Sequence, residues 1–79
     1  MNPINSEDYI YEIVSQNIRK YRKERNMTQA ELAEKCDLSH EFIRRIESTK
    51  GKKKFTITTV YKISIALNVE IDKFFIIEK

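Results

Sequence analysis

Residues 27–47 read MTQAELAEKCDLSHEFIRRIE, and this stretch decides the fold. Thr28, followed three residues later by Glu31, is a capping-box signature that marks the start of a helix. Small and apolar residues come next and predict a short helix. Ser39 is a second N-cap signal and predicts another helix directly after it. Two short helices joined by about three residues form the helix-turn-helix layout, which we place at residues 28–48.

The second of these helices has two unlike faces. Phe42, Ile43 and Ile46 share one side at the helical repeat of about 100° per residue, so they should face a core. A polar outer face suits insertion in a DNA major groove, where donors, acceptors and guanidiniums read base edges. This outer face carries His40, Glu41, Arg44 and Ser48, with Arg45 and Glu47 on its flanks.

A long helix is predicted before this unit. Ser6 can act as its N-cap, and acidic residues follow in the first turn, where the helix dipole favours them. Apolar residues then recur every three or four positions, which predicts a helix over residues 6–25. Asn26 provides a break at its C-terminal end.

Residues 55–67 are ambiguous between a strand and a helix. Alternating apolar residues rich in strand formers favour a strand locally. Such a strand would exceed the usual length of about 5–6 residues and has no obvious partner. We therefore expect a helix over residues 57–67 with Thr56 as N-cap, and a last short helix over residues 71–75. One face of the longer helix would hold Ile57, Val60, Tyr61, Ser64 and Leu67.

The composition fits one small domain over residues 1–79. Hydrophobic residues make up 41% of the chain, and a single cysteine excludes an internal disulfide and fits a reducing compartment. No apolar run approaches the roughly 18 residues of a membrane span. Residues 1–8 have neither the basic nor the apolar region of a signal peptide. We expect a cytoplasmic protein with no membrane partner.

Charge is distributed unevenly along the chain. Fifteen basic and twelve acidic residues give a net charge of +3. Residues 19–25 hold five bases and one acid, and residues 38–54 hold six bases and two acids, a net +4 for each block. Folding that brought both blocks together would create a patch suited to a polyanion.

Three stretches resemble the Xre-type helix-turn-helix proteins, the family of the phage Cro and lambdoid repressor DNA-binding domains. The stretch at residues 27–47 resembles the family's central unit. IRKYRKERNMTQAELA (residues 18–33) matches its first helix and the entry to its second, and FTITTVYKISIALNVEIDKFF (residues 55–75) its fourth and fifth helices. The resemblance covers about residues 17–75. It implies an all-α, compact five-helix lambda-repressor-like domain, and so favours a helix at residues 57–67.

The resemblance also implies roles for individual residues. Gln29 matches a glutamine that touches a backbone phosphate, and Asp37 stands where the family usually has a glycine. Arg22 matches an arginine that pairs with the glutamate found here as Glu47, which would join the first helix to the recognition helix. The implied base-reading residues are Ser39, His40, Glu41, Arg44 and Arg45. Further phosphate contacts are expected from Ser48. The basic loop after it could simply be solvated, but its place beside the recognition helix favours phosphate contacts from Lys50, Lys52, Lys53 and Lys54.

Four consecutive apolar residues near the end of the chain allow two interpretations. One of the two phenylalanines could simply close the core, or the cluster could form a homodimer interface, because exposed apolar clusters usually mark association. Family members often dimerise through the fifth helix. We therefore expect an interface at Phe74, Phe75, Ile76 and Ile77, with two recognition helices about 34 Å apart.

No catalytic or metal-binding motif is visible in the sequence, so we expect no enzymatic activity, cofactor, metal or small-molecule ligand. The expected function is sequence-specific binding of double-stranded DNA by a dimeric transcriptional repressor that reads a pseudo-palindromic operator. One alternative is a controller protein of a restriction–modification system. The other is an antitoxin-like module, whose partner protein would have to bind the long first helix.

Overall fold

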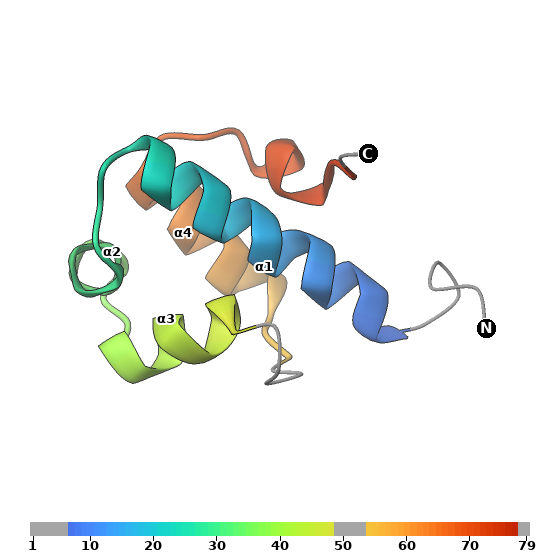
Figure 1. Cartoon of the computed structure of the whole chain (residues 1–79), viewed down its shortest axis with the longest axis horizontal. Coiled ribbons are helices and arrows are strands. Elements are labelled where there is room, and N and C mark those ends of the chain that lie inside the picture. Colours follow the sequence, from blue (N-terminus) through green and yellow to red (C-terminus); the bar gives the residue numbers. More distant parts are fainter. Residues whose placement is uncertain (1–6, 49–53, 78–79) are drawn as a thin grey trace.

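The computed structural model describes residues 7–48 and 54–77. These residues form α1 (Glu7–Glu24), α2 (Gln29–Cys36), α3 (His40–Glu47), α4 (Ile57–Leu67) and the 3₁₀ helix η2 (Ile71–Phe75) (Figure 1). The described segments contain no strand, so the all-α prediction and the helical interpretation of residues 57–67 are confirmed. The predicted fifth helix is present as a single 3₁₀ segment. None of the described helices combines the length and apolarity needed to cross a membrane.

The helix starts follow the capping residues in the sequence. The hydroxyl of Thr28 accepts from the amide of Glu31 at 3.0 Å, while the Glu31 carboxylate accepts from the Thr28 amide at 2.8 Å. These hydrogen bonds lower the pKa of the Glu31 carboxyl. Ser39 and Thr56 cap α3 and α4, because each hydroxyl accepts a hydrogen bond from a backbone amide in the first turn of the helix. The predicted cap at Ser6 lies outside the described residues.

Three helices end at a non-glycine residue in the left-handed conformation. Asn26, Asp37 and Asn68 have φ angles of 56°, 58° and 55°. Asparagine and aspartate adopt this conformation more readily than other non-glycine residues. Asp37 therefore makes the turn between α2 and α3 without the usual glycine, and its amide donates to the last turn of α2.

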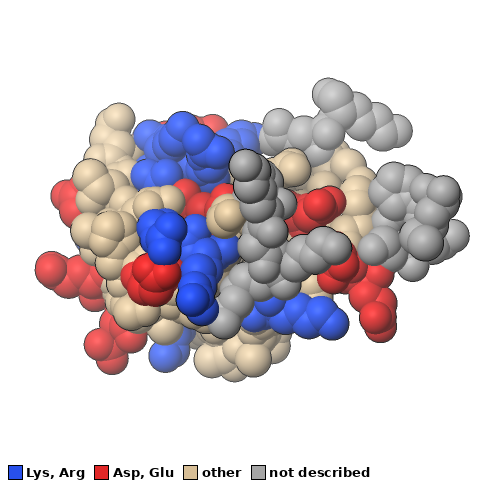
Figure 2. Space-filling view, turned by 60° about the horizontal axis from the view of Figure 1, so that its bottom comes forward, with Lys and Arg blue, Asp and Glu red and all other residues tan. Residues whose placement is uncertain are grey.

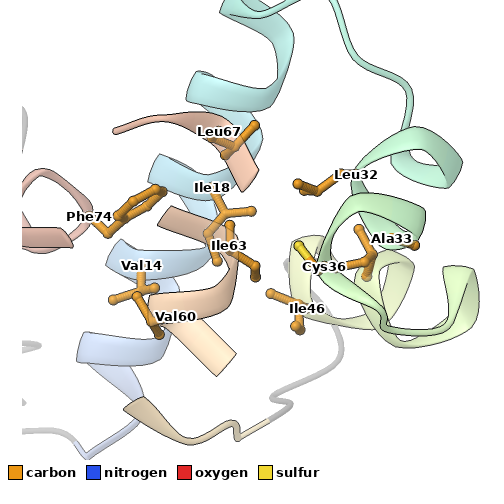
Figure 3. Packing of buried hydrophobic residues seen from close by; sticks show 11 residues of the cluster. Val14, Ile18, Leu32, Ala33, Cys36, Ile46, Val60, Ile63, Leu67 and Phe74 are labelled. Carbon is orange, nitrogen blue, oxygen red and sulfur yellow. The ribbon is translucent and has the colours of Figure 1, made fainter. Parts of the chain in front are cut away.

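Every described element contributes to one core. Ile18, Leu32, Ile43, Ile63 and Phe74 come from α1, α2, α3, α4 and η2, and each is fully buried. Figure 3 shows Phe74 close to the side chains from α1 and α4, while the α2 side chains lie at the opposite end of the cluster. The helix-turn-helix unit is thus fixed to α1 and α4 by continuous apolar packing.

The structure corrects the prediction that Phe74 belongs to a dimer interface. Its side chain has no exposed surface, and its ring packs edge-on against Tyr21 with the centroids 5.6 Å apart. η2 turns Phe74 toward α1, because this short helix lies along α1 on the side away from α3 (Figure 1). Phe75, Ile76 and Ile77 are exposed. The alternative, in which a phenylalanine closes the core, is correct for Phe74.

The predicted apolar face of α4 is also partly wrong. Val60, Ser64 and Leu67 are buried as that face requires, and Ile63 joins them. Ile57 and Tyr61 are 63% and 55% exposed, because α4 packs on both α2 and α1 and so turns Ile63 inward. Another isoleucine, Ile65, is 63% exposed. We call Ile57, Tyr61 and Ile65, spaced four residues apart along α4, the α4 stripe.

A buried asparagine fastens the C-terminal segment to α1. The side-chain amide of Asn17 donates to the carbonyl of Phe74 at 2.8 Å and to that of Ile76 at 2.9 Å. Two backbone acceptors of the segment after α4 are thereby satisfied by one residue of α1. Nearer the start of α1, Tyr11 packs edge-on against Phe55, with ring centroids 5.1 Å apart.

Candidate nucleic-acid interface

The outer side of α3 presents the predicted base-reading residues to solvent. Ser39, which caps the helix, and His40, Glu41, Arg44 and Arg45 are all exposed. On the inner side, Ile43 and Ile46 are buried and Phe42 is partly buried against the core. α3 lies along the lower edge of the molecule in Figure 1.

One carboxylate on this surface contacts two guanidiniums. Glu41 Oε1 lies 2.5 Å from Arg44 Nη2 and 3.4 Å from Arg45 Nε. Glu41 Oε2 accepts from Arg44 Nη2 at 2.8 Å and from Arg44 Nε at 3.3 Å. The hydrogen bonds from Arg44 lower the pKa of the Glu41 carboxyl, which therefore stays ionised at neutral pH. The three side chains together carry a net charge of +1.

A second, buried network supports α3 from beneath. Arg22 donates to Glu47 through Nε at 2.7 Å and Nη2 at 2.9 Å, and through Nη1 to the Met27 carbonyl at 2.7 Å. Gln29 Nε2 donates to Glu47 Oε1 at 3.1 Å. α1, the start of α2 and the end of α3 therefore converge on one carboxylate. The ion pair implied by the family resemblance is present, and it lies inside the protein.

Three of the residues expected to contact phosphates lie in the described part of the chain. Gln29 is half-buried at the start of α2, while Ser48 is exposed at the end of α3 and Lys54 is exposed before α4. Lys50, Lys52 and Lys53 lie outside the described residues. Figure 2 shows basic and acidic side chains interleaved on the face that includes the lower edge of Figure 1. Among the described residues of this face, acidic groups therefore lie between the basic ones.

Part of the basic block at residues 19–25 serves the fold. Arg22 is buried against Glu47, and Arg25 Nε donates to the Leu67 carbonyl at 2.9 Å, at the end of α4. Arg25 Nη2 also reaches the Asn68 carbonyl at 3.3 Å. The charge count along the sequence overestimates how many basic side chains of this block are available to a polyanion, because two of its guanidiniums bind acceptors within the protein.

Sequence reasoning missed two relationships that shape this region. The link of Glu41 to both arginines is implicit in their spacing of three and four residues, which brings helical side chains together. Nothing in the sequence marked Asn17, because its acceptors are backbone carbonyls 57 and 59 positions away. Within the described segments, no cluster of three or more His, Cys, Asp or Glu side chains could hold a metal ion.

Comparison with known proteins agrees with this geometry. A helix-turn-helix family model, HTH_3, matches residues 18–74. The restriction-modification controller protein C.Esp1396I is similar in structure, with 35% identity, a TM-score of 0.74, and coverage of 84% of this chain and 83% of that chain. A comparison with curated proteins finds no match.

Two more distant structures share the fold alone. The controller protein C.AhdI from Aeromonas hydrophila is 22% identical over 82% of this chain and 96% of its own, with a TM-score of 0.74. The hypothetical transcription factor NHTF from Neisseria is 21% identical over 85% of this chain and 75% of its own, with a TM-score of 0.77. Because its family match spans residues 18–74 and α2 and α3 form a capped helix-turn-helix unit, the chain belongs to the HTH_3 helix-turn-helix family.

Proposed function

We propose that this chain, a DNA-binding transcriptional regulator of the helix-turn-helix family, acts as a dimeric repressor that reads a pseudo-palindromic operator. The observation that supports this proposal most is the division of α3 into two faces. Ile43 and Ile46 anchor the helix in the core, while Arg44 and Arg45 extend into solvent on the opposite side. A helix held in this way can enter a major groove without unfolding any of its neighbours.

The dimensions and chemistry of α3 suit direct base reading. A helix with its side chains is about 10–12 Å across, which fits the major-groove width of about 12 Å. Arginine is the commonest reader of guanine, and a glutamate can accept from the amino group of cytosine. Gln29 and Ser48 lie at the two ends of the unit and Lys54 precedes α4, and phosphate contacts from these residues would set the register of the unit on the duplex.

Exposed apolar residues support the dimeric form. Six large apolar side chains are exposed: the three of the α4 stripe, and Phe75, Ile76 and Ile77 at and after the end of η2. α4 and η2 contact each other. Apolar surface of this kind on a small protein marks association. A second copy placed there would present a second α3, with the two helices about 34 Å apart on successive major grooves.

Control of a restriction–modification system is a second candidate function. The observation in its favour is the 35% identity with C.Esp1396I, itself a restriction-modification controller protein. An operator upstream of neighbouring endonuclease and methyltransferase genes would support this role. Recovery of a stoichiometric partner protein in place of DNA would instead favour the antitoxin-like alternative.

Selection of bound DNA from a random duplex pool tests the proposal directly. The full chain should enrich an inverted repeat whose half-sites are centred about 10 base pairs apart, or a multiple of that spacing. Enrichment of a single, unrepeated half-site would contradict the dimeric form. Absence of any enriched sequence would contradict operator recognition as a whole.

A further inference from the structure

Glu41 occupies an unusual place for an acidic residue in a helix proposed to approach DNA. It is exposed on the same face as Arg44 and Arg45, where its charge would repel phosphates. Its two oxygens are nevertheless engaged by both guanidiniums, at distances of 2.5–3.4 Å. Exposed ion pairs of this kind contribute little to helix stability. The arrangement therefore calls for an explanation in terms of what the face binds.

The contacts of Glu41 use one particular edge of the Arg44 guanidinium. Nε and Nη2 of Arg44 both donate to the Glu41 carboxylate. Nη2 also donates to Glu41 Oε1 at 2.5 Å, so among the five N–H donors of the guanidinium those on Nη1 stay clear of Glu41, beside the engaged Nη2. These two nitrogens form the end-on fork that matches O6 and N7 of guanine. Glu41 thus occupies the side edge of Arg44 and engages only Nη2 of the two nitrogens at the base-reading end.

We propose that Glu41 is a specificity-determining positioning residue, which orients the Arg44 fork toward a base edge and offsets the charge that Arg44 and Arg45 would offer to any phosphate. This inference rests on the proposed DNA-reading function of α3. Binding to random DNA depends on cations that neutralise phosphates and release counterions. With Glu41 in place, the face presents a net +1 where two free guanidiniums would present +2.

The variant Glu41→Gln tests this role, because it removes the charge and keeps the shape of the side chain. Glu70→Gln is the matched control: it makes the same charge change at an exposed residue immediately before η2, a helix that lies on the other side of α1 from α3 (Figure 1). The operator is first selected with the wild-type chain. Binding of this operator and of a random duplex is then measured over a series of salt concentrations for the wild type and both variants.

We expect Glu41→Gln to bind random DNA several-fold more tightly, with a log–log salt slope steeper by about 0.9 for each guanidinium released to a phosphate. The ratio of operator to random affinity should fall about tenfold, within the range of one base contact. Glu70→Gln should leave both quantities unchanged. Equal behaviour of the two variants would overturn the role of Glu41. Equal weakening of both DNAs by Glu41→Gln would overturn it as well.

A double-mutant cycle separates positioning from a general charge effect. If Glu41 acts through Arg44, the loss of discrimination caused by Glu41→Gln should disappear in an Arg44→Ala background. An undiminished loss in that background would show that Glu41 does not orient Arg44. If the wild-type chain bound no duplex at all, the proposed function and this inference would both fail. Wild-type operator binding together with a silent Glu41→Gln would remove only the inference.

Discussion

Arg22 of α1 and Glu47 of α3 meet edge to edge, with Nε 2.7 Å from Oε2 and Nη2 2.9 Å from Oε1. The two residues are only 8% and 5% exposed, so the pair lies within the protein interior. Gln29 shares the same carboxylate from the start of α2. One buried carboxylate therefore joins α1, the start of α2 and the end of α3, in addition to their apolar packing.

Replacing Glu47 by glutamine should lower the free energy of unfolding by about 3–5 kcal/mol, because Arg22 would remain buried without a charge partner. Urea denaturation followed by circular dichroism measures this change. The control Glu34→Gln alters an exposed residue of α2 and should shift the free energy by less than about 0.5 kcal/mol. Similar small shifts for both variants would show that the ion pair contributes little.

Arg44→Ala and Arg45→Ala should each reduce discrimination between the operator and random DNA by about 1–3 kcal/mol, because each would remove a side chain that reads a base. Lys54→Ala should instead weaken binding to all sequences and reduce the salt slope by about 0.9, because Lys54 would contact a phosphate. Fluorescence anisotropy with operator and random duplexes measures both effects. Uniform weakening by all three variants would refute the assignment of Arg44 and Arg45 as base readers.

Ile65→Glu should shift the protein from dimer to monomer in sedimentation experiments, because it places a charge in the α4 stripe. Its unfolding transition, measured at low protein concentration where monomers predominate, should change little, since Ile65 is 63% exposed. Ala30→Glu adds the same charge at an exposed position of α2 and should preserve the dimer. A dimeric Ile65→Glu protein would exclude the α4 stripe from the interface, and a monomeric wild type would exclude the dimer.

Cys36 should resist alkylation in the folded protein. Its side chain is buried, and burial raises the pKa of the thiol above its ordinary value of 9.0 by disfavouring the thiolate. The unfolded chain ionises first as pH rises, so the free energy of unfolding should fall above about pH 9. Iodoacetamide labelling followed by mass spectrometry should be slow in buffer and fast in denaturant. Rapid labelling of the folded protein would contradict this environment.

Local chemistry explains why much of the fold could be predicted from the sequence. Thr28 and Ser39 act on amides within their own first turns, so their spacing alone locates the starts of α2 and α3. The two faces of α3 follow from periodicity in the same way. The inward direction of Ile63 depends on how α4 packs against other helices, which its own periodicity does not determine.

The sequence predicts which residues of the candidate site are exposed better than it predicts the contacts among them. Its exposed residues were identified from their positions on α3, but the shared contacts of Glu41 depend on how three neighbouring side chains arrange themselves. The sequence does not distinguish the buried Phe74 from its exposed neighbours, because η2 is short and its orientation is set by packing on α1. Partners distant in sequence decided the orientation of Phe74.

Asn17 and Arg22 lie on the same helix, five residues and about 7.5 Å of helical rise apart. Through Asn17, α1 holds the backbone at Phe74 and Ile76, and through Arg22 it holds Glu47 at the end of α3. The C-terminal segment and α3 are consequently anchored to the same helix. A force applied to the C-terminal segment would therefore be transmitted through α1 to the end of α3.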